Sequence, residues 1–195
     1  VTPVLTIENV ADAVPLGRAL VAGGLPVLEV TLRTPAALDC IERMIAEVEG
    51  AIVGAGTVLN TAQHRVCAEL GCAFTVSPGL VPGQKAGGPA PLLPGVATAS
   101  ELMMGLDAGF TRFKLFPANV VGGVGALKAF ASPFQEARFC PTGGISAANA
   151  AEYLALSNVA CVGGSWVAPA DAIAAGDWAR ITELAAQAAA LPRAR

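Results

Sequence analysis

One lysine of this chain lies in an unusually apolar setting. In the stretch TRFKLFPA, Lys114 is flanked by Phe113 and Leu115. Burying an ammonium group among such neighbours is costly, and lysine is rarely fully buried without a partner. The other two lysines of the chain, Lys85 and Lys128, lie in ordinary exposed contexts. The setting of Lys114 therefore points to a chemical role rather than to a solvated surface charge.

Strand alternation groups Lys114 with other polar side chains. In PVLEVTLRT, Glu29, Thr31 and Arg33 share one strand face with Val27, while the opposite face is wholly apolar. The apolar face suits a helix layer, so we expect the polar face to point into a barrel. Three further inward-facing sets follow from the same alternation: Arg112, Lys114 and Phe116; Val53, Ala55 and Thr57; and Arg138, Cys140 and Thr142. One pocket at the strand ends would then hold Glu29, Thr31, Arg33, Thr57, Lys114 and Thr142.

This combination of side chains suits the chemistry of a ketone. An amine in a dry pocket gives up its proton more easily, because desolvation disfavours its charged form, and a free amine can attack a ketone to form a Schiff base. A carboxylate such as Glu29 can then move a proton on the neighbouring carbon, and Arg33 can grip a substrate carboxylate with two donors. The alternative is a Lys114–Glu29 ion pair that merely fills the barrel, but such pairs stabilise weakly for their desolvation cost.

Two glycine pairs are placed to bind an anion. Gly143 and Gly144 follow the seventh predicted strand in PTGGIS, and Gly163 and Gly164 precede Ser165 in VGGSW. Glycines allow backbone N–H groups to come close to an anion, and a following helix N-terminus favours negative charge. The loops after the last two strands of eight-stranded barrels are a frequent phosphate site. These pairs therefore indicate phosphate, although a single pair is often only a tight turn.

The order of segments predicts the fold that would gather these residues. Strands are expected near 3–7, 26–32, 51–58, 73–78, 91–97, 110–116, 137–143 and 158–164, and helices near 9–23, 35–48, 61–71, 99–108, 123–131, 147–156 and 171–190. The strands are near-continuous apolar runs, as parallel strands covered on both faces should be. The Gly- and Pro-rich stretch after the fourth strand predicts a shortened fourth helix. We therefore expect an α/β fold, a small (β/α)8 TIM barrel forming a single domain over 1–195. A doubly wound open sheet is the alternative, weakened by the lack of a dinucleotide-binding glycine motif.

Composition excludes several classes of protein. The chain has 195 residues, of which 54% are hydrophobic and 14% charged, and its net charge of −3 includes no basic cluster. These values disfavour disorder and a nucleic-acid partner. No apolar run reaches the roughly 18–20 residues that cross a bilayer, and the first residues lack the features of a signal peptide. We therefore expect no membrane association and a cytoplasmic location.

The cysteines and the single histidine do not suggest a metal site. The five cysteines are odd in number and form no CxxC motif, so we interpret them as buried reduced thiols: Cys40, Cys67, Cys72, Cys140 and Cys161. His64 follows a predicted helix start and has no ligand partners nearby, so we expect it to be a solvated helix residue. A metal-dependent enzyme would need several histidine and carboxylate ligands, and no cofactor is indicated.

The motifs taken together resemble one known family. LEVTLRT, IVGAGTV, SPG, LLPGVAT, FKLFPA, FCPTGGIS and GGSW look like the 2-keto-3-deoxy-6-phosphogluconate (KDPG) and 4-hydroxy-2-oxoglutarate (KHG) aldolases, from about residue 3 to residue 185. The resemblance implies a metal-free class I aldolase on a (β/α)8 barrel, a homotrimer. It would cleave 2-dehydro-3-deoxy-6-phosphogluconate to pyruvate and glyceraldehyde 3-phosphate, a step of the Entner–Doudoroff pathway.

The resemblance also implies a role for each motif residue. Lys114 would form the Schiff base, and Glu29 would be the general acid and base. The substrate-binding residues it implies are Arg33 and Thr57 for the pyruvate carboxylate, Phe116 against the imine, Thr142 on the pocket wall, and Gly143, Gly144 and Ser165 for the phosphate.

Three features depart from the family pattern, and two questions stay open. The family's helix before the first strand has no counterpart ahead of Val1, the stretch over residues 80–91 is shorter than usual, and Asn119 stands where glutamate often follows FKLFPA. The sequence does not separate phosphogluconate, phosphogalactonate and hydroxy-oxoglutarate as substrates. A phosphate-binding barrel without chemistry remains the alternative function.

Overall fold

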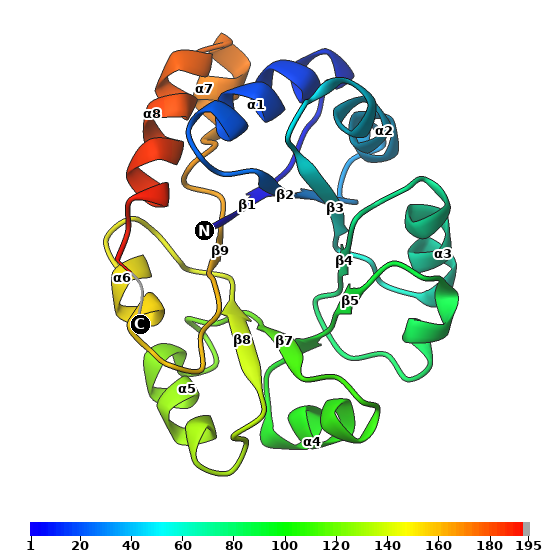
Figure 1. Cartoon of the computed structure of the whole chain (residues 1–195), viewed down its shortest axis with the longest axis vertical. Coiled ribbons are helices and arrows are strands. Elements are labelled where there is room, and N and C mark those ends of the chain that lie inside the picture. The colour runs from blue at the N-terminus through cyan, green and yellow to red at the C-terminus, as the bar shows by residue number, and fades with distance from the viewer. Residues whose placement is uncertain (193–195) are drawn as a thin grey trace.

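Within residues 1–192, which the computed structural model describes apart from the side chains of residues 85 and 86, eight parallel barrel strands form a ring surrounded by helices (Figure 1). The strands are β1 (Thr2–Leu5), β2 (Val27–Thr31), β3 (Ile52–Gly56), β4 (Thr75–Val76), β5 (Leu92–Leu93), β6 (Gly95–Val96), β7 (Arg112–Leu115), β8 (Arg138–Pro141) and β9 (Gly163–Gly164). The short elements β5 and β6 are the two halves of the fifth barrel strand.

Pairing between neighbouring strands closes the ring. One sheet has the order β5-β4-β3-β2-β1-β9 and the other β6-β7-β8. The fifth strand joins them on one side, where Pro94 separates its two halves and accepts a hydrogen bond from the Lys114 N–H at 2.8 Å. Parallel bridges from Thr142 to Gly163 and from Phe139 to Val159 join them on the other side. The barrel prediction is therefore confirmed over the doubly wound alternative.

The helices alternate with the strands, with one departure from the expected pattern. They are α1 (Val10–Ala22), α2 (Ala37–Glu47), α3 (Thr61–Glu69), the 3-10 turn η1 (Gln84–Gly87), α4 (Ala99–Asp107), α5 (Gly123–Ala131), α6 (Ala150–Leu154), α7 (Ala170–Ala175) and α8 (Trp178–Ala189). The shortened fourth helix is confirmed as the single turn η1. The single helix expected over 171–190 is wrong: Gly176, at φ 63°, ends α7, and the Asp177 side chain caps α8.

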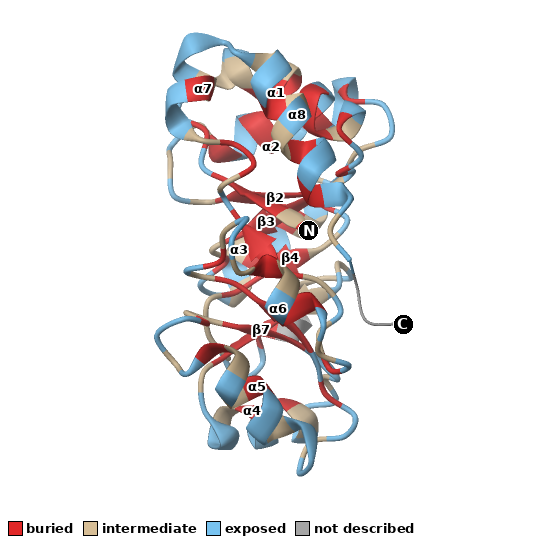
Figure 2. Cartoon of the chain, turned by 90° about the vertical axis from the view of Figure 1, so that its left-hand side faces the viewer, coloured by how far each residue is buried: buried red, intermediate tan, exposed pale blue. Residues whose placement is uncertain are grey.

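The core lies between the strands and the helix layer, as the apolar strand faces predict. Leu28 and Val30 of β2 are fully buried, and so is Phe113 of β7. A Cβ atom on Gly105 of α4 would strike the Phe113 ring, so glycine there lets α4 pack close against β7. Figure 2 shows the buried strands across the middle of the molecule, with exposed surface on the outer sides of the helices. The strand that carries Lys114 is thereby held from outside.

Local capping signals explain several helix starts. Asn60 accepts a hydrogen bond from the Gln63 N–H at the start of α3. Thr98 and Glu101 form a reciprocal capping box at the start of α4. Such side chains satisfy backbone donors that the first turn of a helix leaves unpaired. None of the helices in the described part of the chain is long and apolar enough to cross a membrane.

The structure corrects the expectation that His64 is solvated and agrees with the expectation that the cysteines are buried thiols. His64 is fully buried rather than solvated, with Nδ1 2.8 Å from the Thr75 hydroxyl and Nε2 3.4 Å from the Gly88 carbonyl. The face of α3 that carries it is covered by the end of η1, where a Cβ atom on Gly87 would strike the His64 ring. The five cysteines, all within residues 1–192, form no disulfide, and all except the half-buried Cys161 are buried.

Candidate active site

The barrel opens at the carboxyl ends of its strands into a pocket of about 500 Å³. Active sites of such barrels gather at this end. Two of its walls carry the glycine pairs, and a third carries Arg33. The residues that line it are Val4, Thr6, Arg33, Phe116, Pro117, Asn119, Val120, Thr142, Gly143, Gly144, Ile145, Gly163, Gly164 and Ser165. Most of the predicted binding residues are therefore brought together.

Lys114 and Glu29 meet inside the barrel below this pocket. The Lys114 Nζ lies 3.1 Å from Glu29 Oε1, and the two side chains are 5% and 3% exposed. They come from β7 and β2, which stand apart in the ring, and 85 residues separate them along the chain. The neighbours of Lys114 in the sheet are Gly95 of β6 and Cys140 of β8. The predicted pairing is present and fully enclosed.

Glycine in β3 makes room for the carboxylate. A Cβ atom on Gly56 would strike the Glu29 side chain, and one on Gly54 would strike the Phe74 ring. The glycines of β3 therefore face the barrel interior, and Val53 and Ala55 face outward to the apolar core. This corrects the expected alternation, which placed Val53 and Ala55 inside.

Thr57 lies beside Arg33, but not because of the strand alternation that predicted its position. Its backbone is in the left-handed region, at φ 58°, which takes it out of the strand alternation. Its hydroxyl accepts a hydrogen bond from Arg33 Nε at 3.3 Å. The Arg33 side chain is exposed, and its two terminal nitrogens donate to no acceptor among residues 1–192. Those nitrogens remain available to a carboxylate at the pocket rim.

Phe116 and Thr142 flank the amine. The Lys114 Nζ lies 5.2 Å from the centroid of the Phe116 ring, an arrangement that suits a cation or an iminium ion over the ring face. Thr142 is buried, and its hydroxyl approaches the Cys140 carbonyl at 3.4 Å. Lys128, by contrast, is exposed on α5, and the side chain of Lys85 lies outside the described residues. Lys114 is thus buried beside a carboxylate and an aromatic ring, whereas Lys128 faces solvent.

The glycine pairs border the pocket on the far side from Arg33. Gly143 and Gly144 have φ values of 97° and 77°, a conformation that favours glycine. Their N–H groups donate to no acceptor in the described part of the chain. The helices that follow the two pairs, α6 and α7, begin at Ala150 and Ala170, close to the starts expected at 147 and 171. Backbone N–H groups and the exposed Ser165 hydroxyl are therefore the anion donors that this wall offers.

Sequence reasoning missed several pocket residues. Thr6 and Val4 face the pocket from the end of β1, and Asn119 packs against Gly144. The alternation in TPVLTI already places Thr2, Val4 and Thr6 on one face. Applied to the first strand, the rule that found Glu29 would have found Thr6.

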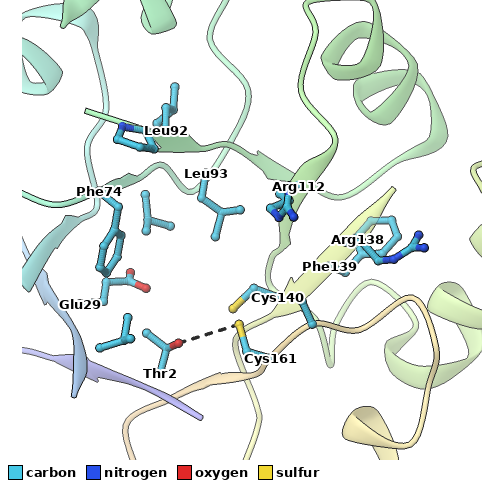
Figure 3. Close-up of a pocket in the computed structure, with 14 residues that line it drawn as sticks. Thr2, Glu29, Phe74, Leu92, Leu93, Arg112, Arg138, Phe139, Cys140 and Cys161 are labelled. Atoms are coloured by element: carbon cyan, nitrogen blue, oxygen red, sulfur yellow. Dashed lines mark hydrogen bonds between the residues drawn. The ribbon is translucent and has the colours of Figure 1, made fainter. Parts of the chain in front are cut away.

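A second opening lies at the amino ends of the strands. Its cavity, of about 360 Å³, is lined by apolar side chains with Arg112 and Arg138 among them, and Glu29 faces it (Figure 3). The Thr2 hydroxyl lies 3.9 Å from the Cys161 sulfur there. The hydrogen bond with Cys161, followed by burial, raises the pKa of the Cys140 thiol well above its ordinary value. Cys140 is therefore held as an unreactive thiol beside the amine.

Titratable side chains do not cluster elsewhere as metal ligands. Among the residues that the structure describes, no group of three or more His, Cys, Asp or Glu side chains is arranged to hold a metal ion.

The fold and the site together define a class: a (β/α)8 barrel with a lysine–carboxylate pair buried inside it and an open pocket at the carboxyl ends of its strands. The family model described as KDPG and KHG aldolase matches residues 1–184. The KHG/KDPG aldolase of Escherichia coli (strain K12) is 56% identical over 191 residues, which cover 96% of this chain and 90% of that protein. The chain therefore belongs to the KDPG and KHG aldolase family.

Two solved structures are similar over nearly the whole fold. The aldolase of Zymomonas mobilis ZM4 with 3-phosphoglycerate has a TM-score of 0.93 and 54% identity, covering 99% of this chain and 92% of that one. The KDPG aldolase of Legionella pneumophila, with pyruvate captured as a covalent carbinolamine intermediate, also has a TM-score of 0.93, at 46% identity, covering 96% and 92%.

Proposed function

We propose that this protein is a class I aldolase that cleaves 2-dehydro-3-deoxy-6-phosphogluconate to pyruvate and glyceraldehyde 3-phosphate. The observation that carries the proposal is the Lys114–Glu29 contact of 3.1 Å inside the barrel, where both side chains are buried. A buried ion pair is a weak way to stabilise a fold, so a pair in this place supports chemistry rather than packing. The named relative and the captured carbinolamine support the same reaction.

The reaction begins at the ketone. The Lys114 Nζ adds to C2 of the substrate, and loss of water from the carbinolamine gives an iminium ion. Glu29 then removes the proton of the C4 hydroxyl; the C3–C4 bond breaks, the aldehyde leaves, and the electron pair passes into the iminium as an enamine. Protonation of C3 by Glu29 gives the pyruvate iminium, and water releases pyruvate from Lys114. Every proton in this sequence moves within reach of one carboxyl group.

The remaining residues hold the two ends of the substrate. Arg33 and Thr57 bind the C1 carboxylate, and the Phe116 ring packs on the imine. The phosphate binds to the unpaired N–H groups of Gly143 and Gly144 and to the neighbouring segment, formed by Gly163, Gly164 and Ser165, with Thr142 between the ends of the substrate. No metal or other cofactor takes part in these steps.

Borohydride trapping tests the proposal. Incubation with pyruvate and sodium borohydride, in excess EDTA, should reduce the iminium and add the mass of reduced pyruvate to Lys114, as peptide mass spectrometry can show. Lys114→Ala should carry no adduct, while Lys128→Ala, which changes an exposed lysine, should be labelled like the wild type. An adduct of equal yield in Lys114→Ala would contradict the assignment. Ligand-induced stabilisation without turnover would favour the non-catalytic phosphate-binding barrel.

The wider setting of the enzyme is also inferred. The related protein named for both substrates supports a second activity on 4-hydroxy-2-oxoglutarate. Met103 and Met104 of α4 are 62% and 53% exposed beside a cavity that Val81 and Phe110 line, a surface suited to association into the homotrimer. Buried thiols without disulfides suit a reducing cytoplasm.

A further inference from the structure

Thr6 occupies a place on the pocket wall that the reaction as described leaves unused. It follows the last residue of β1, its side chain lines the pocket, and it is exposed to whatever the pocket holds. Strand β1 lies between β2, which carries Glu29, and β9, which carries Gly163 and Gly164. Val4 pairs in register with Glu29. Thr6 is therefore two residues, or roughly 7 Å, nearer the mouth than the catalytic carboxylate.

The hydrogen bonds around Thr6 determine whether its hydroxyl acts as a donor or an acceptor toward the pocket. Thr31 is fully buried, and its hydroxyl donates its single proton to the Leu5 carbonyl at 2.8 Å. The Thr6 and Thr31 oxygens are 3.2 Å apart. Since the Thr31 proton is already committed, the proton between the two hydroxyls must come from Thr6. The Thr6 oxygen is thus left as a hydrogen-bond acceptor toward the pocket.

The substrate runs past this acceptor. Its carboxylate end lies at Arg33, beyond β2, and its phosphate end lies at the glycine wall of β8 and β9. The C4 hydroxyl must face Glu29, so the next carbon toward the phosphate comes alongside β1. We propose that Thr6 accepts a hydrogen bond from the C5 hydroxyl of the phosphorylated sugar acid and is a specificity-determining residue of this site. This inference rests on the proposed aldolase function.

The acceptor character of the Thr6 oxygen discriminates between the two substrates of the family. In 4-hydroxy-2-oxoglutarate, C5 is a carboxylate, which has no proton to donate. Two acceptors would then face each other, unless the Thr6 proton turned away from Thr31 and gave up that hydrogen bond. A site that bonds a substrate hydroxyl disfavours an analogue without it, because a polar group is left unpaired. Thr6 therefore favours the phosphorylated sugar acid.

Thr6→Val tests the role, because it removes the hydroxyl and keeps the branched shape. The variant is assayed in the synthetic direction, with pyruvate and either D-glyceraldehyde 3-phosphate or 3-oxopropyl phosphate, which has the same length but lacks the hydroxyl that becomes C5–OH. We expect the ratio of the two kcat/KM values to fall three- to tenfold, the usual effect of losing one neutral hydrogen bond. In cleavage, the preference for the phosphorylated sugar acid over 4-hydroxy-2-oxoglutarate should fall likewise.

Thr6→Ser is the matched control, because it keeps the oxygen and should restore both ratios to near the wild-type values. Equal losses with the two aldehydes in Thr6→Val, or unchanged ratios, would overturn the inference and leave Thr6 as a packing residue. Borohydride trapping of pyruvate in both variants tests the aldolase function separately from the role of Thr6. An adduct on Lys114 supports Schiff-base formation, whatever the two kcat/KM ratios show. Its absence in the wild type would instead overturn the aldolase proposal.

Discussion

At the scale of single residues, the proposed reaction gives Glu29 two roles. Its carboxylate lies 3.1 Å from the Lys114 amine, and in the proposed reaction it takes the proton of the C4 hydroxyl and protonates C3. Its burial keeps water from competing for either role. The amine and the carboxylate therefore contribute to different steps, which a substitution can separate.

Glu29→Gln should separate them. The amide keeps the shape of the side chain but cannot take a proton, so we expect the variant still to form the pyruvate imine. Exchange of the pyruvate methyl protons with deuterium oxide should slow by about 10²- to 10⁴-fold, the usual contribution of a general base. Proton NMR measures the exchange, and the yield of the borohydride adduct is the control. Exchange at the wild-type rate would remove Glu29 from proton transfer.

Individual residues also show how far the sequence predicts a site. Lys114 and Glu29 could be found because a charge in an apolar strand stands out against the rule of alternation. Thr57 could be selected but not placed correctly, because its left-handed backbone breaks that rule. The prediction that His64 is solvated was wrong because the burial of a helix face depends on which segments pack on it, here β4 and the end of η1, and local sequence does not record this.

At the scale of secondary-structure elements, β3 shapes the site through what it lacks. Its two inward positions are glycines, and the space they leave is filled by the Glu29 side chain and the Phe74 ring of neighbouring segments. A strand with side chains at both positions would push the carboxylate away from Lys114. The position of Glu29 is thus set by an element that contributes no functional group of its own.

Gly56→Ala should therefore impair catalysis. The added methyl group would displace the Glu29 carboxylate, and misplacement of a reacting group by about 1 Å lowers kcat on the order of 10²-fold. Gly125→Ala in α5 is the matched control, because its Cβ atom would meet nothing within 4 Å. The control should keep its kcat and gain up to about 1 kcal/mol in helix stability. Steady-state kinetics and urea unfolding of both variants measure these effects, and wild-type kcat in Gly56→Ala would contradict the argument.

The elements themselves follow the sequence closely where capping and hydrophobic pattern agree. The start of α4 at a Thr98 capping box and the single turn η1 in a Gly- and Pro-rich stretch are examples. The split between α7 and α8 was missed because Gly176 interrupts an otherwise continuous alanine-rich pattern. A single glycine in a helical pattern allows either a tolerated interruption or a stop, and packing selects between them.

At the scale of the whole molecule, the sector of β4 and β5 is the part of the ring where helix packing is reduced. A full helix is replaced there by η1, and His64 of α3 joins Thr75 of β4 to the Gly88 carbonyl after η1. Gln84 of η1 is also buried and donates to the Val58 carbonyl at 3.0 Å. Polar bonds between segments thus replace part of the missing helix packing.

His64→Ala should destabilise the barrel as a unit. The change leaves a cavity and unpairs the Thr75 hydroxyl, so we expect the free energy of unfolding to fall by about 2–4 kcal/mol. Arg65→Ala is the control, because its side chain is exposed on the same helix, and it should change stability by less than about 0.5 kcal/mol. Equilibrium urea unfolding followed by circular dichroism measures both variants, and equal stability in the two would contradict a structural role for His64.

The barrel as a whole was predictable because eight apolar strands alternating with helices have few ways to close. The contacts that close the barrel could not be predicted from the sequence. The kink at Pro94 and the bridge from Thr142 to Gly163 depend on contacts between segments far apart in the chain.

Because 85 residues separate Lys114 from Glu29 along the chain, their contact forms only when the barrel has folded. Neither strand can bring its charge to the other until the intervening sheet has formed and curved back on itself. Enzymatic competence should then vanish together with the cooperative melting of the chain, not before it. A partly assembled ring holds an ordinary solvated ammonium group, inert toward the keto acids around it.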